Sequence, residues 1–253
     1  MAIFDERLEQ LITEALSEDT GDGDHTTLSC IPPQQEGKAI LKIKDDGILA
    51  GVDIAHRIFS HVESAVSFAA FKKDGDAIQN GETGFEISGH IHTILRCERL
   101  VLNCMQRMSG IATVTRKYVE KLAGYKTKLL DTRKTTPNFR LFEKWAVQIG
   151  GGTNHRFGLY DMIMIKDNHV DASGGIAIAI QKAHDYLLRT NKKLKIEKIN
   201  HCLFLHWFFI GYWILKRGSI SMQPFFIMKK ARLQRSGAFA MIFNWILKRV
   251  NQQ

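Results

Sequence analysis

The stretch 162-MIMIKDNHVDASGGIAIAIQKAHDYLLRTNKKLKIE-197 decides the fold class. A short apolar run, MIMIK, precedes a helical pattern through GIAIAIQKAHDYLL, and a second strand-like run, KLKIE, follows it. Two strands separated by a helix of this length suit a parallel crossover. Upstream, KLLDT at 128–132 and LFEKWAVQI at 141–149 predict one further strand and one further helix. The alternation from Lys126 to Glu197 therefore predicts the opening of an α/β barrel or of a doubly wound sheet.

Residues 1–112 follow a different pattern. Some runs alternate apolar and polar residues and end at Asp-Gly or Asn-Gly turns, as strands do, whereas others have helical periodicity. We expect one α+β domain over residues 1–112, with a helix break at Ser109-Gly110, and the first part of an α/β barrel over residues 113–197. The strand-like runs lie at 39–51 and 66–88, and the helical runs lie at 52–62 and 94–122.

The formal net charge of +9 comes entirely from the last quarter of the chain. All 26 Asp and Glu lie at or before Glu197; nine of the 35 Lys and Arg follow it, which leaves 26 basic residues against 26 acidic ones. Residues 198–253 hold no acid and eleven of the 24 aromatic residues, a composition atypical of globular domains. We interpret them as a basic, aromatic tail of out-of-frame or foreign sequence joined to a truncated barrel.

Two other interpretations of this tail are a membrane-surface anchor and a nucleic-acid-binding arm. Its apolar run at 203–215 is shorter than the roughly 18 residues that span a bilayer. Neither interpretation explains why a barrel should stop after three strands with its core uncovered. We therefore expect no membrane partner and no nucleic-acid partner.

The cysteines and the first residues indicate a reducing compartment. The start, MAIFDERLEQLITEAL, has acidic residues where an export signal needs basic ones. The cysteines form no C-x-x-C pair, which favours free thiols over a zinc site or a disulfide framework. The sequence therefore predicts a cytoplasmic protein. The cysteines are Cys30, Cys97, Cys104 and Cys202.

Charged groups gather at the carboxyl ends of the predicted strands, where α/β folds bind their ligands. Several cations on one such face repel one another unless an anionic ligand with more than one charged group lies between them. The sequence therefore predicts a site for a polyanion that carries phosphate, carboxylate or both. The groups are Arg133 and Lys134 of DTRK, His155 and Arg156 of GGGTNHR, Lys166 of KDNH, and Glu197.

The ordered motifs DTRKTTP, GGGTNHR and IKDNH, with ERLVLN at 98–103 and MSGIAT at 108–113, resemble the quinolinate phosphoribosyltransferase family, also called carboxylating nicotinate-nucleotide pyrophosphorylase. The resemblance covers residues 1 to about 197. It implies a homodimer whose subunit has an N-terminal α+β sandwich domain followed by an α/β barrel, here incomplete. Enzymes of this family join quinolinate to phosphoribosyl pyrophosphate with Mg²⁺. They release pyrophosphate and carbon dioxide and make nicotinate mononucleotide for NAD biosynthesis.

The resemblance also implies roles for individual residues. Arg133, His155, Arg156 and Lys166 would hold the two carboxylates of quinolinate, and Lys134 would face phosphoribosyl pyrophosphate. Arg99 would be contributed across the dimer interface to the site of the neighbouring subunit. The catalytic groups implied are Lys134, Lys166 and Glu197, with Glu197 also the metal ligand.

The chain departs from the family after Glu197. Family members continue with an E-x-E pair, an L-D-N strand end and two late glycine loops, whereas Ile199 occupies the second acidic position here. We therefore expect the chain as written to fold poorly and to have little or no activity. Two alternatives remain open: a molybdenum-transport-associated relative in the same superfamily, and a non-catalytic protein that binds membrane or nucleic acid through its tail.

Overall fold

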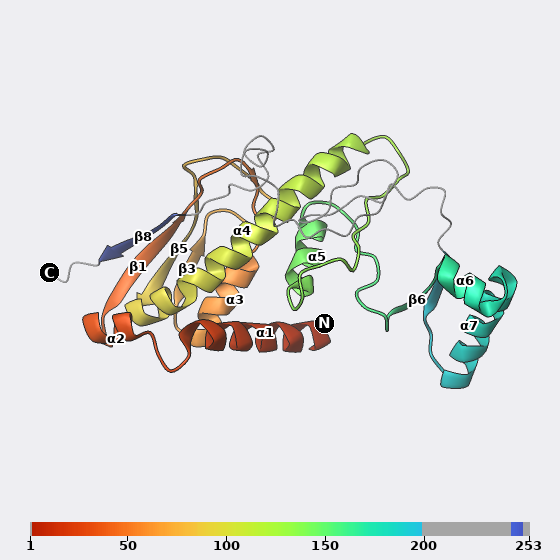
Figure 1. Ribbon diagram of the computed structural model, residues 1–253. Helices are drawn as coiled ribbons and strands as arrows, with labels where there is room; N and C mark the ends of the chain where they lie inside the picture. Colours follow the sequence, from red (N-terminus) through yellow and green to blue (C-terminus); the bar gives the residue numbers. More distant parts are fainter. Residues whose placement is uncertain (1, 199–243, 250–253) are drawn as a thin grey trace, which may run out of the picture.

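The computed structural model describes residues 2–198 and 244–249, and side chains from Asp5 to Lys198 (Figure 1). The elements, in chain order, are α1 (Ala2–Thr20), α2 (His25–Cys30), β1 (Glu36–Lys42), β2 (Gly47–Ile48), α3 (Val52–Val62), β3 (Ser67–Ala70), β4 (Ala77–Ile78), β5 (Thr83–His90), α4 (Ile91–Lys121), α5 (Arg140–Ile149), β6 (Met162–Ile165), α6 (Asp167–Ser173), α7 (Ile176–Thr190), β7 (Lys195–Lys198) and β8 (Asn244–Arg249).

The N-terminal domain is a layer of helices packed on an antiparallel sheet of order β3-β5-β1-β8. Along β1, Ala39 and Leu41 are buried, whereas Lys38 and Lys42 point outward and bond to Glu86 and Thr83 of β5. This alternation of buried and outward residues is what one solvated face of an antiparallel sheet requires. Apolar side chains of α1, α3, α4 and α5 complete one core with this sheet.

Helix α4 is continuous from Ile91 to Lys121, so the break predicted at Ser109-Gly110 is wrong. The hydroxyl of buried Ser109 donates to the backbone O of Ala50 (3.1 Å) and accepts from its N–H (2.9 Å). Thr113, one turn later, accepts from the N–H of Ile48 (2.9 Å). Small residues at this point let α4 approach the backbone near β2 closely, and the helix continues past the N-terminal domain to contact α5 (Figure 1).

The C-terminal part has the predicted parallel crossover. β6 and β7 pair in parallel, with Ile163 opposite Ile196, and α7 connects them. The strand predicted at 128–132 is wrong as a strand, because Leu130 makes only an isolated parallel bridge, with Thr153, among residues 2–198 and 244–249. Thr153 follows a turn in which Gly151 has φ +92°.

Helix α6 was not predicted. It begins at Asp167, directly after β6, so the KDNH motif opens a short helix instead of forming an extended strand end. The N–H of Lys166 donates to Nδ1 of His169 (3.0 Å), which satisfies a backbone group at the start of this helix.

The predictions about residues 198–253 fall mostly outside the described residues, and so do Ile199 and Cys202. Of this segment the structure describes Lys198, at the end of β7, and the backbone of β8, which is the antiparallel edge strand beside β1. Within residues 2–198 and 244–249, no helix combines the length and hydropathy needed to span a membrane.

Candidate active site

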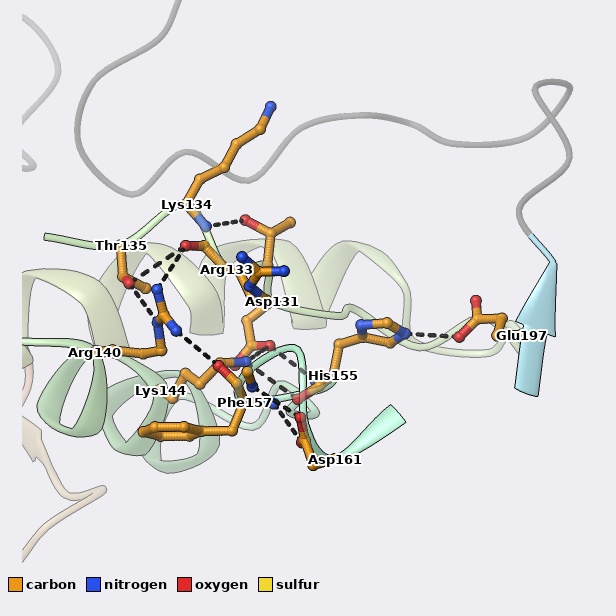
Figure 2. A network of polar contacts seen from close by, with 12 residues as sticks. Asp131, Arg133, Lys134, Thr135, Arg140, Lys144, His155, Phe157, Asp161 and Glu197 are labelled. Atoms are coloured by element: carbon orange, nitrogen blue, oxygen red, sulfur yellow. Dashed lines mark hydrogen bonds and ion pairs between the residues drawn. The ribbon is translucent and has the colours of Figure 1, made fainter. Parts of the chain in front are cut away.

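Apart from Arg99, which lies on α4, the predicted site residues come from four segments of the C-terminal part, one of which is Lys166 directly after β6. Arg133 and Lys134 lie in the loop that follows the Leu130 bridge, and His155 and Arg156 lie in the loop that follows α5. Glu197 lies on β7. Figure 2 shows the two loops facing each other, with His155 extended toward the strand that carries Glu197.

His155 connects the loop after α5 to β7. Its Nε2 lies 2.7 Å from Oε2 of Glu197, in an ion pair if the ring is protonated. The imidazole side chain is 14% exposed and the carboxylate 37%. One of the groups expected to bind an anionic ligand is thus already paired with a carboxylate of the protein.

Arg133 and Arg156 form the cationic centre of the site. Burial lowers the pKa of the Arg156 guanidinium, and the positive charge of Arg133 lowers it further. Nε of Arg133 is buried and has no hydrogen-bond partner within the part of the chain that the structure describes. A guanidinium donor in this situation is costly unless an acceptor reaches it. The pair therefore has the charge and the donor that an anionic ligand requires.

The other three predicted cations are exposed, whereas Arg133 and Arg156 are partly buried. Arg99 is exposed on α4, eight residues before Arg107, or about 12 Å along the helix axis. Arg107 itself contacts α5 through Glu143. The side chain of Lys134 points away from Arg133 in Figure 2, and its N–H donates to Oγ1 of Thr132 (3.1 Å). Lys166 is exposed at the end of β6.

The sequence interpretation missed a buried ion pair beneath these loops. Nζ of Lys144, on α5, donates to Oδ1 of Asp131, and the two side chains are only 2% and 7% exposed. Burial raises the pKa of Asp131 and lowers that of Lys144, and their mutual attraction opposes both shifts. A signal was present in the sequence. Lys144 lies three residues after Leu141 and three before Val147, on the buried face of an amphipathic helix, where a lysine requires an acidic partner.

Two further residues of α5 contact the loop that carries Arg133. Arg140 donates from Nε to Oγ1 of Thr135 (2.9 Å) and from an Nη atom to the backbone O of Phe157 (3.0 Å). Glu143 accepts from the N–H of Thr136 (3.2 Å) and from its hydroxyl (2.9 Å). Helix α5 therefore contributes polar groups to both loops.

The chain matches two family models in succession. Residues 24–109 match "Quinolinate phosphoribosyl transferase, N-terminal domain" and residues 111–201 match "Quinolinate phosphoribosyl transferase, C-terminal domain". The crystal structure of NadC from Streptococcus pyogenes is similar to this chain with a TM-score of 0.70 at 41% identity, and the likeness covers 76% of this chain and 67% of NadC. This chain belongs to the quinolinate phosphoribosyltransferase family. The resemblance inferred from the motifs is confirmed, and so is the fold class, an N-terminal α+β sandwich domain followed by an incomplete α/β barrel.

Plant members of the quinolinate phosphoribosyltransferase family are also similar. A chloroplastic carboxylating nicotinate-nucleotide pyrophosphorylase of Arabidopsis thaliana is 46% identical over 191 residues, and a decarboxylating quinolinate phosphoribosyltransferase (1b) of Nicotiana tabacum is 44% identical over 191 residues. Each alignment covers 75% of this chain and 54% of the relative. The chain therefore spans about half the length of these relatives.

Few protein groups could coordinate the Mg²⁺ that is expected for this family. Within the described ranges, no group of three or more His, Cys, Asp or Glu side chains could hold a metal ion. One carboxylate oxygen of Glu197 is hydrogen-bonded to His155, so the other oxygen is the one that could bind the metal ion. Mg²⁺ often binds through one or two carboxylates and the phosphates of its substrate. The residues fit a metal that arrives on a diphosphate, with Glu197 as one ligand, better than a metal resident in the protein.

Proposed function

We propose that this protein is a phosphoribosyltransferase that uses quinolinate and phosphoribosyl pyrophosphate to make nicotinate mononucleotide for NAD biosynthesis. Membership of the family supports this proposal, as do the names of the relatives, which are carboxylating pyrophosphorylases and quinolinate phosphoribosyltransferases. These names favour it over the molybdenum-transport-associated alternative.

The observation that carries the proposal is the pair Arg133 and Arg156. Their charges are close enough for one to lower the pKa of the other, and Nε of Arg133 is buried without a partner among the described residues. Guanidinium groups bind carboxylates through paired hydrogen bonds. Quinolinate has two adjacent carboxylates, which suit two neighbouring guanidinium groups, with His155 and Lys166 as additional donors.

The proposed reaction needs no protein nucleophile. The pyridine nitrogen attacks C1 of the ribose while the bond from C1 to the pyrophosphate oxygen breaks, and pyrophosphate leaves with that electron pair. The bond from C2 of the ring to its carboxyl carbon then breaks, and carbon dioxide leaves. The electron pair stays on C2, stabilised by the adjacent ring cation, and accepts a proton from water. The residues of the chain hold the dianion in the orientation for attack, with Lys134 toward the phosphoribosyl group.

Three further features belong to the proposal. Mg²⁺ would neutralise charge on the departing diphosphate, with Glu197 as one protein ligand. Arg99 would complete the site of a second subunit in a homodimer, which agrees with its exposure and its position on α4 away from Arg107. The compartment would be the cytoplasm, because Cys30, Cys97 and Cys104 are free thiols.

Two measurements on the full chain test this function. Calorimetric titration should show that quinolinate binds at least about tenfold more tightly than nicotinate, which lacks one carboxylate. Equal affinities, or no quinolinate binding, would remove the basis of the proposal. Release of pyrophosphate from phosphoribosyl pyrophosphate, dependent on quinolinate and Mg²⁺, then measures turnover separately from binding. It also tests the expectation that the chain as written has little activity.

A further inference from the structure

The loop that carries Arg133 and Lys134 is held at both ends by two consecutive residues of α5. Lys144 donates to Asp131 at its beginning, and Glu143 accepts two hydrogen bonds from Thr136 at its end. Since α5 packs into the common core through Leu141 and Ala146, these three bonds tie the loop to that core.

The same ion pair also holds the second loop. Oδ1 of Asp131 accepts from the N–H of His155 (2.8 Å), and Nζ of Lys144 donates to the backbone O of His155 (3.2 Å). When the amide of Asn154 is oriented to donate, its nitrogen lies 2.6 Å from Oδ2 of Asp131. Both backbone groups of His155 are therefore bonded to the pair that fixes the start of the other loop, as Figure 2 shows.

Stability alone is a poor explanation for this arrangement. Removing two charges from water often costs as much as their attraction returns, and a buried pair is commonly no more stable than apolar residues of similar volume. Here burial shifts both groups toward their neutral forms, since it raises the pKa of Asp131 and lowers that of Lys144. Unlike apolar residues of the same volume, the ion pair makes directional hydrogen bonds that hold two loops at fixed positions relative to each other.

We propose that Lys144 and Asp131 are positioning residues that set the spacing between Arg133 and Arg156 and so select a ligand with two adjacent carboxylates over a ligand with one. This inference rests on the proposed function. This role requires no contact of either residue with the ligand. They act through the two loops, and their loss affects the ratio of affinities for a dicarboxylate and a monocarboxylate more than it affects anion binding as such.

The experiment compares Lys144→Met with Lys38→Met in the full chain. Lys38 also pairs with a carboxylate, that of Glu86 at 3.0 Å, but on the exposed face of the N-terminal sheet. Calorimetry gives the dissociation constants of quinolinate and nicotinate for each variant, at a temperature where circular dichroism shows it folded. We expect Lys144→Met to lower the selectivity for quinolinate at least about tenfold, and Lys38→Met to change it less than about twofold.

A second variant covers the case in which Lys144→Met fails to fold because Asp131 is left as a buried, uncompensated charge. Asp131→Asn combined with Lys144→Met removes both charges and keeps an oxygen that can accept from the N–H of His155. We expect this double variant to fold and to lose selectivity as Lys144→Met does. It should also exchange the amide hydrogen of His155 faster than the Lys38→Met chain, because the bond from Lys144 to the backbone O of His155 is lost.

The outcomes separate the two proposals. If the original chain shows no preference for quinolinate, the proposed function fails, and the inference fails with it. If the original chain prefers quinolinate and the folded variants of Lys144 keep that preference, the proposed function stands and the positioning role is overturned. A lower melting temperature with unchanged selectivity also overturns it, because that is the result for a residue that only stabilises the fold.

Discussion

Nε2 of His155 lies 2.7 Å from Oε2 of Glu197, so a carboxylate of the protein occupies a group proposed to bind a carboxylate of the ligand. Glu197 also acts on Arg156, since its negative charge opposes the lowering of the Arg156 pKa. Glu197 therefore competes with the anionic ligand for His155 and Arg156. Because only one of its oxygens is on His155, the other can serve a metal ion carried by the second substrate.

This competition predicts opposite effects of Glu197→Gln on the two substrates. The glutamine retains an oxygen for His155 but loses the negative charge, so quinolinate should bind about twofold to fivefold more tightly, as expected for a partly exposed ion pair. Phosphoribosyl pyrophosphate with Mg²⁺ should bind more weakly. Calorimetric titration of each substrate measures both effects, and Glu86→Gln on β5 is the control. Weaker quinolinate binding would show that Glu197 supports the dianion site.

Arg133→Met should separate ligand binding from stability. The methionine removes a buried donor that has no partner in the described part of the chain, and it removes the repulsion of Arg156. Quinolinate affinity should fall about 10- to 100-fold, the value of one hydrogen bond to a charged group. The melting temperature should stay the same or rise.

Arg57→Met is the matched control for Arg133→Met, since Arg57 pairs with Asp5 at 2.9 Å in the N-terminal domain. It should leave quinolinate binding unchanged. A clear drop in melting temperature for Arg133→Met would mean that Arg133 stabilises the fold and is not held ready for a ligand. Calorimetry and thermal denaturation of both variants decide between these roles.

The elements that sequence periodicity predicted well are those whose pattern is set by burial. Helix α3 matches the predicted residues 52–62, and α5 begins one residue before the predicted 141–149, because one face of each helix is buried and the other is polar. The prediction of a strand at 128–132 was wrong because an apolar run does not show over how many residues a neighbouring segment pairs with it. Helix α4 continues through Ser109, whose hydroxyl bonds to Ala50, a residue 59 positions away in the sequence that local periodicity does not reveal.

In the candidate site, too, some features could be predicted from the sequence and others depend on contacts between distant residues. Cations at strand ends could be read from the motifs, whereas the residues that hold them in place could not. Lys144 had a detectable signal, a charge on a buried helical face. Its partner Asp131 was only one of several acids near predicted strand ends, and the bond from His155 to Asp131 joins backbone to side chain. Such bonds depend on loop geometry, for which periodicity carries no information.

Replacing the buried carboxylate of Asp74 should increase stability in a pH-dependent way. Its Oδ1 accepts from the N–H of Val52 (2.8 Å) and caps α3, whose N-cap residue Gly51 has no side chain to do so. Burial raises the pKa of Asp74, and the nearby charge of Asp53 raises it further against the hydrogen bonds that lower it. The folded state therefore binds this proton more tightly than the unfolded state, so ionised Asp74 destabilises the fold at neutral pH.

Asp74→Asn keeps an acceptor for Val52 and removes the buried charge. We expect the free energy of unfolding at pH 7 to increase by up to about 1 kcal/mol. The gain should shrink as the pH falls through the raised pKa toward 3.8, the ordinary value, because Asp74 is then protonated in both states. Urea denaturation at pH 7 and pH 4 measures this, with Asp22→Asn, whose side chain is 93% exposed, as control. A larger gain at pH 4 than at pH 7 would contradict the argument.

A substitution at Gly150 tests whether the site depends on the packing of α5 against α4. A Cβ at this position would lie 2.6 Å from the backbone O of Ala112 and 2.6 Å from Cβ of Thr115, both on α4. The backbone dihedral of Gly150 is an ordinary φ of −69°, so an alanine would be limited by space and not by conformation. Gly150→Ala should therefore push α5 away from α4 and cost about 2–3 kcal/mol of stability.

Gly21→Ala is the control for Gly150→Ala, because Gly21 has φ +54° and open space where its Cβ would lie. It should cost about 1 kcal/mol or less, and it should leave quinolinate binding unchanged. Gly150→Ala should weaken quinolinate binding even below its melting temperature, since α5 carries Glu143 and Lys144. If Gly150→Ala melts at or above the temperature of Gly21→Ala and binds quinolinate normally, contact with α4 does not hold α5 in place, and the two loops are fixed by their own hydrogen bonds.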